Sequence, residues 1–86
     1  RHACRRIDED FASDLTASAL ARECGMSLFH FSRVFAELTG LPPHRYLLRA
    51  RFTAADAMLR EGASVTETCF AVGFGDLSHF TRSFSR

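Results

Sequence analysis

The sequence contains nearly the same six residues twice, as HFSRVF at residues 30–35 and as HFTRSF at residues 79–84. In each copy two phenylalanines stand four residues apart, and an arginine lies midway between them. Residues four apart share one face of a helix, whereas a residue midway between them points to a different face. Each copy therefore predicts a helix that its phenylalanines anchor in a core, with Arg33 or Arg82 directed away from that core.

The repeat is wider than these six residues. Its earlier part pairs Leu20-Ala21 with Phe70-Ala71, and Gly25 with the region of Gly73 and Gly75. The turn between the two parts differs by one residue between the copies. A helix, a glycine-containing turn and a second helix form the sequence signature of a helix-turn-helix.

Every long periodic pattern in the sequence is helical, and no alternating strand pattern is present. Candidate N-caps and helix-ending glycines divide the chain into six predicted helices. In chain order, the boundary residues are Thr16, Gly25, Ser27, Gly40, Pro43, Gly62, Ser64, Gly73 and Asp76. The sequence therefore predicts an all-α fold of two helix-turn-helix units, each a homeodomain-like bundle, joined by a long linker helix over residues 43–61.

Apolar stripes mark the face that each helix is expected to bury. In the helices outside the linker, the stripe residues are Cys4, Ile7, Phe11, Leu20, Ala21, Phe31, Val34, Phe35, Leu38, Leu77, Phe80 and Phe84. The linker carries one stripe of Leu47, Ala50, Ala54 and Met58 and a second of Leu48, Phe52, Ala55 and Leu59. A helix that is apolar on two sides can pack against two bodies at once.

Composition excludes several classes of protein. The chain has 86 residues, the length of one domain, and its 47% hydrophobic and 24% charged residues are typical of a soluble globular protein. It contains no run of 18 apolar residues, so no membrane span is predicted. Cys4, Cys24 and Cys69 form no CxxC motif, which favours a reducing, cytoplasmic setting.

Positive charge is concentrated in the first repeated helix and the linker. Residues 28–60 carry five arginines against Glu37 and Asp56, a net charge of +3, although the net charge of the whole chain is only +1. This distribution is a weak electrostatic footprint for a polyanion.

The exposed faces of the third and sixth helices are the candidate base-reading surfaces. A recognition helix anchors one face in its own domain and places the other in a major groove. The residues predicted on these faces are Phe29, Ser32 and Arg33 in the first unit, and Ser78, Thr81, Arg82 and Ser85 in the second. Arginine can bind guanine through two hydrogen bonds, hydroxyl groups can bind several base edges, and an apolar side chain can contact a thymine methyl.

Five other residues are weaker candidates, for phosphate contacts. They are Ser27, His30, Arg45, Arg49 and His79. For the two histidines, which adjoin core phenylalanines, the preferred interpretation is a partly buried, hydrogen-bonded side chain. The two arginines share a polar helix face with Asp56 and Arg60. For them, the preferred interpretation is an ordinary solvated charge.

The linker helix sets the distance between the two units. As a helix, residues 43–61 span roughly 28 Å, and one turn of DNA is about 34 Å long. Recognition helices at about 28–39 and 77–86, packed near the two ends of this rod, are therefore predicted to enter successive major grooves.

Taken together, these residues resemble the DNA-binding domain of AraC/XylS-type bacterial transcription regulators. The likeness covers nearly the whole chain and lies in the order and spacing of the matching residues. These are Leu20-Ala21, Gly25-Met26-Ser27, His30 to Phe35, Thr39-Gly40, Pro43, Tyr46-Leu47, Arg51-Phe52, Ala55, Val72-Gly73-Phe74, Asp76, Ser78 and Phe80 to Phe84.

The resemblance implies one DNA-binding domain over residues 1–86, with units at 3–40 and 64–86 around the linker at 43–61. It implies binding to double-stranded promoter DNA and contact with RNA polymerase, in the bacterial cytoplasm at the nucleoid. It also implies an N-terminal effector or dimerisation domain, so the chain is expected to be part of a longer regulator, truncated in its second unit.

One pair of residues departs from the family pattern. Thr68 and Cys69 stand where an aliphatic residue and an alanine are usual. A buried threonine requires a hydrogen-bond partner, so the fifth helix is expected to need one for Thr68.

Two other functions compete with DNA reading by both units. In the first, one unit contacts RNA polymerase or another partner and only the other unit reads DNA, which the weak net charge allows. In the second, a metal is bound by Cys24, His30, Cys69 or His79, but these lack zinc-type spacing. No nucleophile–base pair, phosphate-binding loop or carboxylate pair stands at a useful spacing, so no enzyme, metal site or cofactor is predicted.

Overall fold

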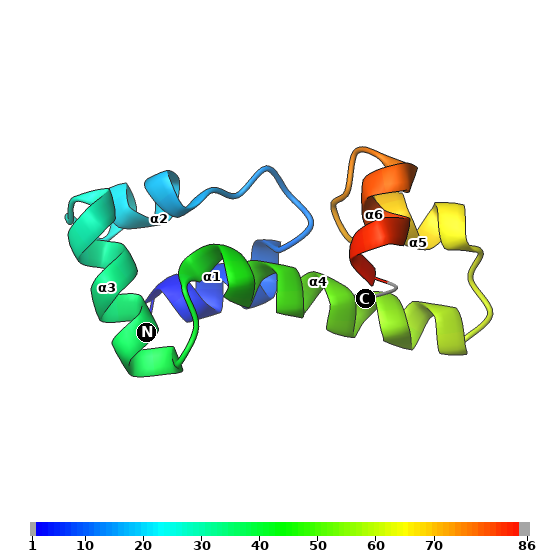
Figure 1. The fold of residues 1–86 in the computed structure, drawn as a ribbon, viewed down its shortest axis with the longest axis horizontal. Helices are drawn as coiled ribbons and strands as arrows, with labels where there is room; N and C mark the ends of the chain where they lie inside the picture. The colour runs from blue at the N-terminus through cyan, green and yellow to red at the C-terminus, as the bar shows by residue number, and fades with distance from the viewer. Residues whose placement is uncertain (1, 85–86) are drawn as a thin grey trace.

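The computed structural model describes residues 2–84, and they form six α-helices joined by short turns (Figure 1). The helices are α1 (His2–Asp10), α2 (Ala17–Glu23), α3 (Leu28–Thr39), α4 (Pro43–Arg60), α5 (Val65–Ala71) and α6 (Leu77–Phe84). Over these residues there is no β-strand, so the all-α prediction is confirmed. None of the six helices combines the length and the hydropathy that crossing a membrane requires.

Side-chain caps begin four of the helices at the predicted residues. The hydroxyl oxygens of Thr16, Ser27 and Ser64 each accept a hydrogen bond from the backbone N–H three residues later, at 3.0–3.1 Å. Glu67 completes a capping box by accepting from the Ser64 N–H at 3.1 Å. Asp76 Oδ1 accepts from the N–H two residues later at 2.8 Å. These caps satisfy N–H groups that a helix start otherwise leaves unpaired.

The turns of the two helix-turn-helix motifs are closed in the same way. Gly25 and Gly73 both have positive φ, +70° and +106°, which residues with a side chain rarely adopt. Each glycine N–H donates to the carbonyl three residues earlier, and the next N–H, of Met26 or Phe74, donates to the carbonyl five residues earlier. Gly73 is therefore the structural counterpart of Gly25, and the extra residue of the second turn follows it. Counted back from these glycines, Leu20-Ala21 corresponds to Thr68-Cys69, and both pairs are the buried residues of their helices. The sequence-based pairing of Leu20-Ala21 with the exposed Phe70-Ala71 is therefore wrong.

The helices enclose two separate cores. The buried residues of the first core are Ala3, Ile7, Leu15, Leu20, Ala21, Phe31 and Phe35, from α1, α2, α3 and the turn after α1. Those of the second are Ala55, Cys69, Val72, Phe74 and Phe80, from α4, α5, α6 and the turn between the last two. Helix α4 serves both cores.

A single apolar stripe of α4 packs against both cores, and not against one core only. Leu47 and Ala50 pack against the first core, whereas Ala54 and Met58, from the same stripe, pack against the second. The division runs along the helix, because the two bundles lie at different positions along its length (Figure 1).

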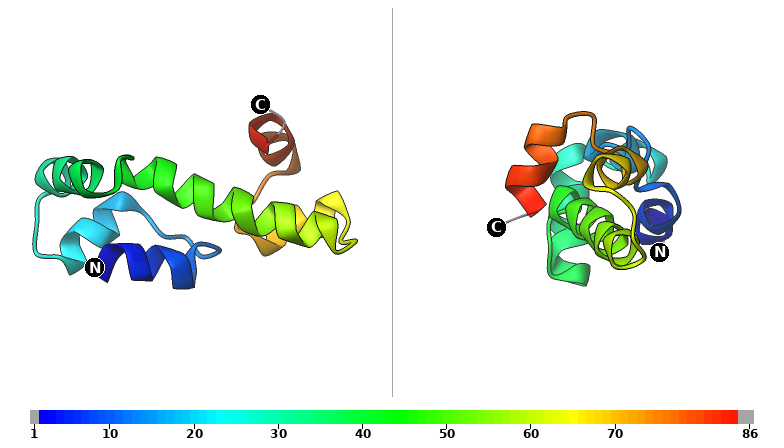
Figure 2. Two further views of the ribbon diagram at one scale, coloured as in Figure 1. Left: turned by 90° about the horizontal axis from the view of Figure 1, so that it is seen from below. Right: turned by 90° about the vertical axis from the view of Figure 1, so that its right-hand side faces the viewer.

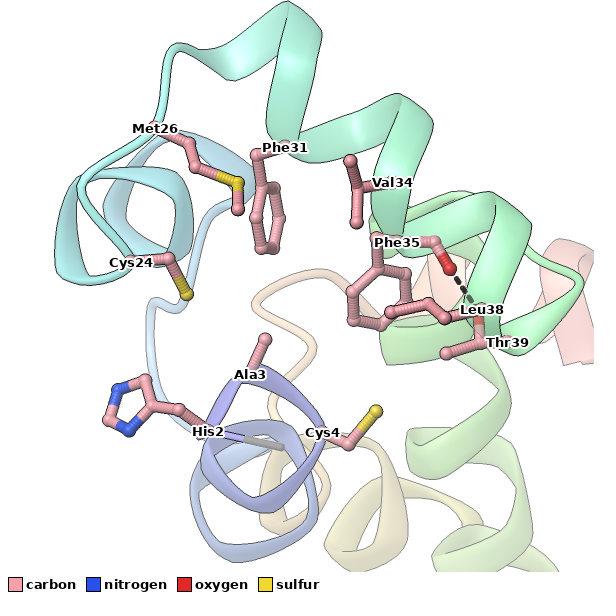
Figure 3. A pocket seen from close by; sticks show the side chains of 10 residues that line it. All are labelled: His2, Ala3, Cys4, Cys24, Met26, Phe31, Val34, Phe35, Leu38 and Thr39. Carbon is pink, nitrogen blue, oxygen red and sulfur yellow. Dashed lines mark hydrogen bonds between the residues drawn. The ribbon is translucent and has the colours of Figure 1, made fainter.

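Two of the predicted core residues are exposed, which corrects the sequence-based stripes. Leu38, in the last turn of α3, is 64% exposed, and Leu77, in the first turn of α6, is 38% exposed. The ends of these helices extend past the elements that cover their middles. Leu38 borders an apolar cavity of about 140 Å³ between α1 and α3. Figure 3 shows it beside Phe35, whose carbonyl accepts a hydrogen bond from the Thr39 hydroxyl at 2.8 Å.

Thr68 has the partner that its burial requires. Its side chain is fully buried, and its hydroxyl donates to the Ser64 carbonyl at 2.8 Å. The neighbouring Cys69 is equally buried, and this burial raises the pKa of its thiol. Both departures from the family pattern are thus accommodated in the packing of α5.

Candidate nucleic-acid interface

Helices α3 and α6 lie toward the same side of α4. In the right-hand view of Figure 2, α3 and α6 lie on one side of α4 and α1 lies on the other; in the left-hand view α6 and α1 lie on opposite sides of α4, and α3 lies level with its N-terminal end. In Figure 1, both helices run downward, α3 beside the N-terminal end of α4 and α6 above its C-terminal half. The molecule is elongated, with extents of 40 × 21 × 21 Å. Two helices of matching direction are therefore presented together, separated along the long axis.

The first of these helices, α3, is anchored by its phenylalanines. Phe31 and Phe35 are 4% and 5% exposed, with ring centroids 5.6 Å apart, and Phe35 meets the ring of Tyr46 edge-on at 5.3 Å. On the opposite side, Phe29 is 76% exposed and Arg33 is exposed. Ser32, the third predicted base-reading residue here, is only half-buried.

Helix α6 is anchored by a stack of aromatic rings. Phe80 is 1% exposed, and its ring lies 5.2 Å from that of Phe74 and 5.3 Å from that of Phe84, which is half-buried. The predicted base-reading residues Ser78, Thr81 and Arg82 are exposed. The Thr81 hydroxyl donates to the Leu77 carbonyl at 2.9 Å, so its oxygen is left to accept a hydrogen bond from outside. Ser85 lies outside the described residues.

The two repeat arginines make no ion pair within residues 2–84. The arginine ion pairs found there join Arg6 to Asp10 and Glu23, and Arg60 to Asp56. Arg33 and Arg82 thus present positive charges at corresponding places on two helices of matching direction.

The sequence-based interpretation of the two histidines is wrong. His30 and His79 were expected to be partly buried, but both are exposed. Each lies in the first turn of its helix, ahead of the buried phenylalanine that follows it. The His79 ring contacts the ring of Phe74 edge-on, with centroids 5.4 Å apart.

The polar face of α4 agrees with the prediction of solvated charges. Arg45 and Arg49 are exposed, and the Arg49 guanidinium lies over the ring of Tyr46 at 5.4 Å. Arg60 Nε donates to Asp56 Oδ2 at 2.7 Å, as the four-residue spacing predicted. Within residues 2–84 no three His, Cys, Asp or Glu side chains are grouped as a metal site would need.

Arg51 is the residue that the sequence analysis missed. Its Nε donates to the Phe11 carbonyl at 2.6 Å and its Nη2 donates to the Ser13 carbonyl at 2.9 Å. Its guanidinium also lies over the ring of Phe74 at 5.6 Å. The only signal in the sequence was its place among the residues that resemble a known family, because its partners are backbone carbonyls of a distant loop.

Comparisons with known proteins agree with this arrangement. A family model described as a helix-turn-helix domain matches residues 20–86. The HTH-type transcriptional activator RhaS of Salmonella schwarzengrund (strain CVM19633) is 40% identical over 81 residues, which are 93% of this chain and 29% of that protein. RhaS of Salmonella newport (strain SL254) is 38% identical over 81 residues, with the same coverage of both chains. The chain thus spans less than a third of the length of these curated relatives.

Solved structures share the same arrangement of helices. The C-terminal domain of the two-component response regulator yesN from Fusobacterium nucleatum matches with a TM-score of 0.92 at 27% identity, over 98% of this chain and 89% of that chain. A probable AraC family transcriptional regulator from Rhodopseudomonas palustris matches with a TM-score of 0.76 at 26% identity, over 98% of this chain and 84% of that chain.

Proposed function

The chain belongs to the AraC/XylS-type helix-turn-helix family of DNA-binding transcription regulators, which are not enzymes, and we propose that it reads a promoter site with two recognition helices at once. In this proposal α3 and α6 enter successive major grooves on one face of the duplex. Residues 3–40 and 64–86 act as the two reading units, and residues 43–61 act as the spacer between them.

One observation carries the proposal: α3 and α6 lie on the same side of α4 and run in the same direction (Figures 1 and 2). Helix α4 has 18 residues, or about 27 Å at 1.5 Å per residue. The major groove returns to the same face of DNA after about 34 Å. The 40 Å length of the molecule accommodates that repeat.

Each recognition helix is assigned three base-reading residues. Arg33 and Arg82 would bind guanine edges, because neither guanidinium has an acidic partner within residues 2–84. Phe29 would contact a thymine methyl, and Ser32 would contact a base edge beside it. Ser78 and Thr81 would contact base edges in the part of the site that α6 reads.

Phosphate contacts are assigned to residues around the first unit and the start of α6. They are Ser27, His30, Arg45, Arg49 and His79. All five side chains are exposed. Ser27, His30 and His79 lie at helix N-termini, where the backbone N–H groups and the helix dipole also favour an anion.

The rest of the regulator is proposed from its relatives. The RhaS proteins are named transcriptional activators, and the 81 residues that match this chain are 29% of their length. We propose that the full protein also has an N-terminal effector or dimerisation domain, and that it contacts RNA polymerase at the promoter.

A second candidate function uses only one unit for DNA. The outer surface of α5 exposes two large apolar side chains, Val65 at 50% and Phe70 at 53%. Exposed apolar groups of this kind favour contact with a protein rather than with DNA. In this alternative, the second unit binds RNA polymerase or another partner, and only α3 reads bases.

In vitro selection from random double-stranded DNA distinguishes the two. The chain is expected to select two short half-sites about 10 base pairs apart. Arg33→Ala and Arg82→Ala should each relax one base position, at a cost of about 1–3 kcal/mol. Arg60→Ala, on the opposite end of α4 from the first unit, is the control. An Arg82→Ala protein with unchanged affinity and specificity would favour the one-unit alternative.

A further inference from the structure

The loop after α1 contacts the turn between α5 and α6, although these segments belong to different units. Arg51, near the middle of α4, joins them. Its hydrogen bonds reach the carbonyls of Phe11 and Ser13 in the first unit, while its guanidinium lies against the Phe74 ring of the second. Phe11 itself packs against both cores. Helix α4 is therefore not the only connection between the two units.

Gly73 shows how closely the two segments approach. A Cβ atom at this position would lie 2.9 Å from the Cα of Ala12, and 3.0 Å from both the Ala12 carbonyl oxygen and Arg51 Nε. Contacts below 3.0 Å with backbone atoms cannot be relieved by turning a side chain. Any side chain at position 73 would therefore push the turn of the second unit away from the loop of the first.

The contact is polar and partly shielded from water. Arg51 is half-buried, and this burial lowers the pKa of its guanidinium, whereas the nearby charge of Asp14 raises it. An arginine nonetheless stays protonated under all conditions in which proteins fold. Two hydrogen bonds from a charged donor to backbone carbonyls are stronger and more directional than neutral ones.

We propose that Arg51, Gly73 and the loop at 11–13 form a rigid joint, which fixes the position of α6 relative to α3. We define these residues as the joint. Its role in DNA reading rests on the function proposed above. Arg51 is then a positioning residue: it touches no DNA, and it holds the two recognition helices at one spacing and one rotation.

The consequence for DNA is selectivity for the spacing of the half-sites. Inserting one base pair moves a half-site by about 3.4 Å and rotates it by about 35°. A rigid pair of helices cannot follow that change, whereas two units connected only by α4 can partly adapt.

NMR residual dipolar couplings test the joint without DNA. Couplings from both units of the unaltered chain should fit one alignment tensor. In Arg51→Met, which keeps the length of the side chain but donates no hydrogen bonds, we expect each unit to fit its own tensor. Arg60→Met is the control, because its guanidinium pairs within α4. A single shared tensor in Arg51→Met would overturn the proposal.

Gly73→Ala tests the joint at its residue in the second unit. This variant also provides a test if Arg51→Met does not fold. Its control is Gly62→Ala, because Gly62 has a φ of +100° but no atom within 4 Å of an added Cβ. Both substitutions place a side chain at a similar positive φ, +106° and +100°, and only Gly73→Ala has a clash between units. Two tensors in Gly73→Ala and one in Gly62→Ala are expected. One tensor in both would contradict the joint.

Binding to DNA then tests the role of the joint. Against sites with one added base pair, the unaltered chain should lose affinity on the order of tenfold or more, as for a mismatched base pair. Arg51→Met should lose less than about threefold, with unchanged affinity for a single half-site. An equal loss in both proteins would refute the positioning role. If the unaltered chain gains nothing from a second half-site, the proposed function fails, and the NMR result still decides the joint.

Discussion

Arg33 and Phe31 stand two residues apart in the sequence and have opposite surroundings in the structure. Phe31 is 4% exposed in the first core, whereas Arg33 is exposed; Phe80 and Arg82 repeat the pair in α6. The period of the helix alone separates these residues onto different faces. At the scale of the residue, each copy of the repeat therefore combines an aromatic anchor with an exposed cation.

Exchanging Phe31 or Phe29, two of the three phenylalanines of α3, for alanine should change stability by very different amounts. Phe31→Ala should lower the free energy of unfolding by about 3–5 kcal/mol, because it leaves a cavity in the first core. Phe29→Ala, at a position 76% exposed, should change it by less than about 0.5 kcal/mol. Urea denaturation measures both. Equal losses would show that Phe29 packs inside the protein.

Acid should weaken the contact between α1 and α2. Hydrogen bonds from Arg6, and then from His2, lower the pKa of Glu23 from its ordinary value of 4.5 to about 2. The folded-state pKa is depressed, so this stabilisation is complete above about pH 4.5 and is lost as the pH falls toward 2. The difference in unfolding free energy between the unaltered chain and Glu23→Gln should therefore shrink over that range.

The control for this measurement is Glu37→Gln. Glu37 is exposed on α3 and forms no ion pair with any residue from 2 to 84. If the Glu23 difference stayed constant between pH 4.5 and 2, the pairing of Glu23 with Arg6 would have no part in folding.

Residue-level prediction failed where burial depends on the ends of helices. Periodicity identified the faces of α3 and α6 but placed Leu38 and Leu77 in the core and His30 at its edge. Periodicity says which way a side chain points and not whether a neighbouring element reaches that turn. Arg51 was missed for a related reason, since its acceptors are backbone groups that carry no sequence signal.

The helices themselves follow from local chemistry, so their boundaries were largely predictable. A hydroxyl or carboxylate that accepts from the first-turn N–H groups is a short-range interaction, visible as Thr16, Ser27, Ser64 and Asp76 in the sequence. The glycines with positive φ that end α2 and α5 are equally local. The sharing of α4 between two cores was less predictable, because it depends on where each bundle lies along the helix.

Removing the capping box should destabilise α5 more than an ordinary surface change. Ser64→Ala deletes the acceptor of the Glu67 N–H, which lies at 3.0 Å, and should lower the free energy of unfolding by about 1 kcal/mol. Ser18→Ala is the control, because Ser18 is exposed inside α2 and alanine favours a helix there. Thermal or urea unfolding of the two variants compares them. If Ser64→Ala lowered the free energy of unfolding by no more than Ser18→Ala does, the capping role of Ser64 would be contradicted.

At the scale of the whole molecule, the two cores are connected by α4, Phe11 and the joint. Because Phe11 packs on both cores and Arg51 bonds to one unit while lying against the other, we expect a single cooperative unfolding transition. In calorimetry the measured enthalpy should equal the van't Hoff enthalpy. Two resolved transitions in the unaltered chain would show that the units fold independently.

The existence of two similar units could be predicted from the repeat, but their relative placement could not. The repeat describes how each unit is built, and the length of α4 limits how far apart the units lie. The contact of Gly73 with Ala12 sets their mutual orientation, and no pattern in the sequence links these two positions.

If one chain reads two successive major grooves through α3 and α6, hydroxyl-radical footprinting of the chain on its selected DNA site should show both contacts. We expect two protected patches on one face of the duplex, about 10 base pairs apart. Arg82→Ala should weaken the patch assigned to α6, and Arg33→Ala should weaken the other. A single protected patch within one groove would contradict reading by both helices.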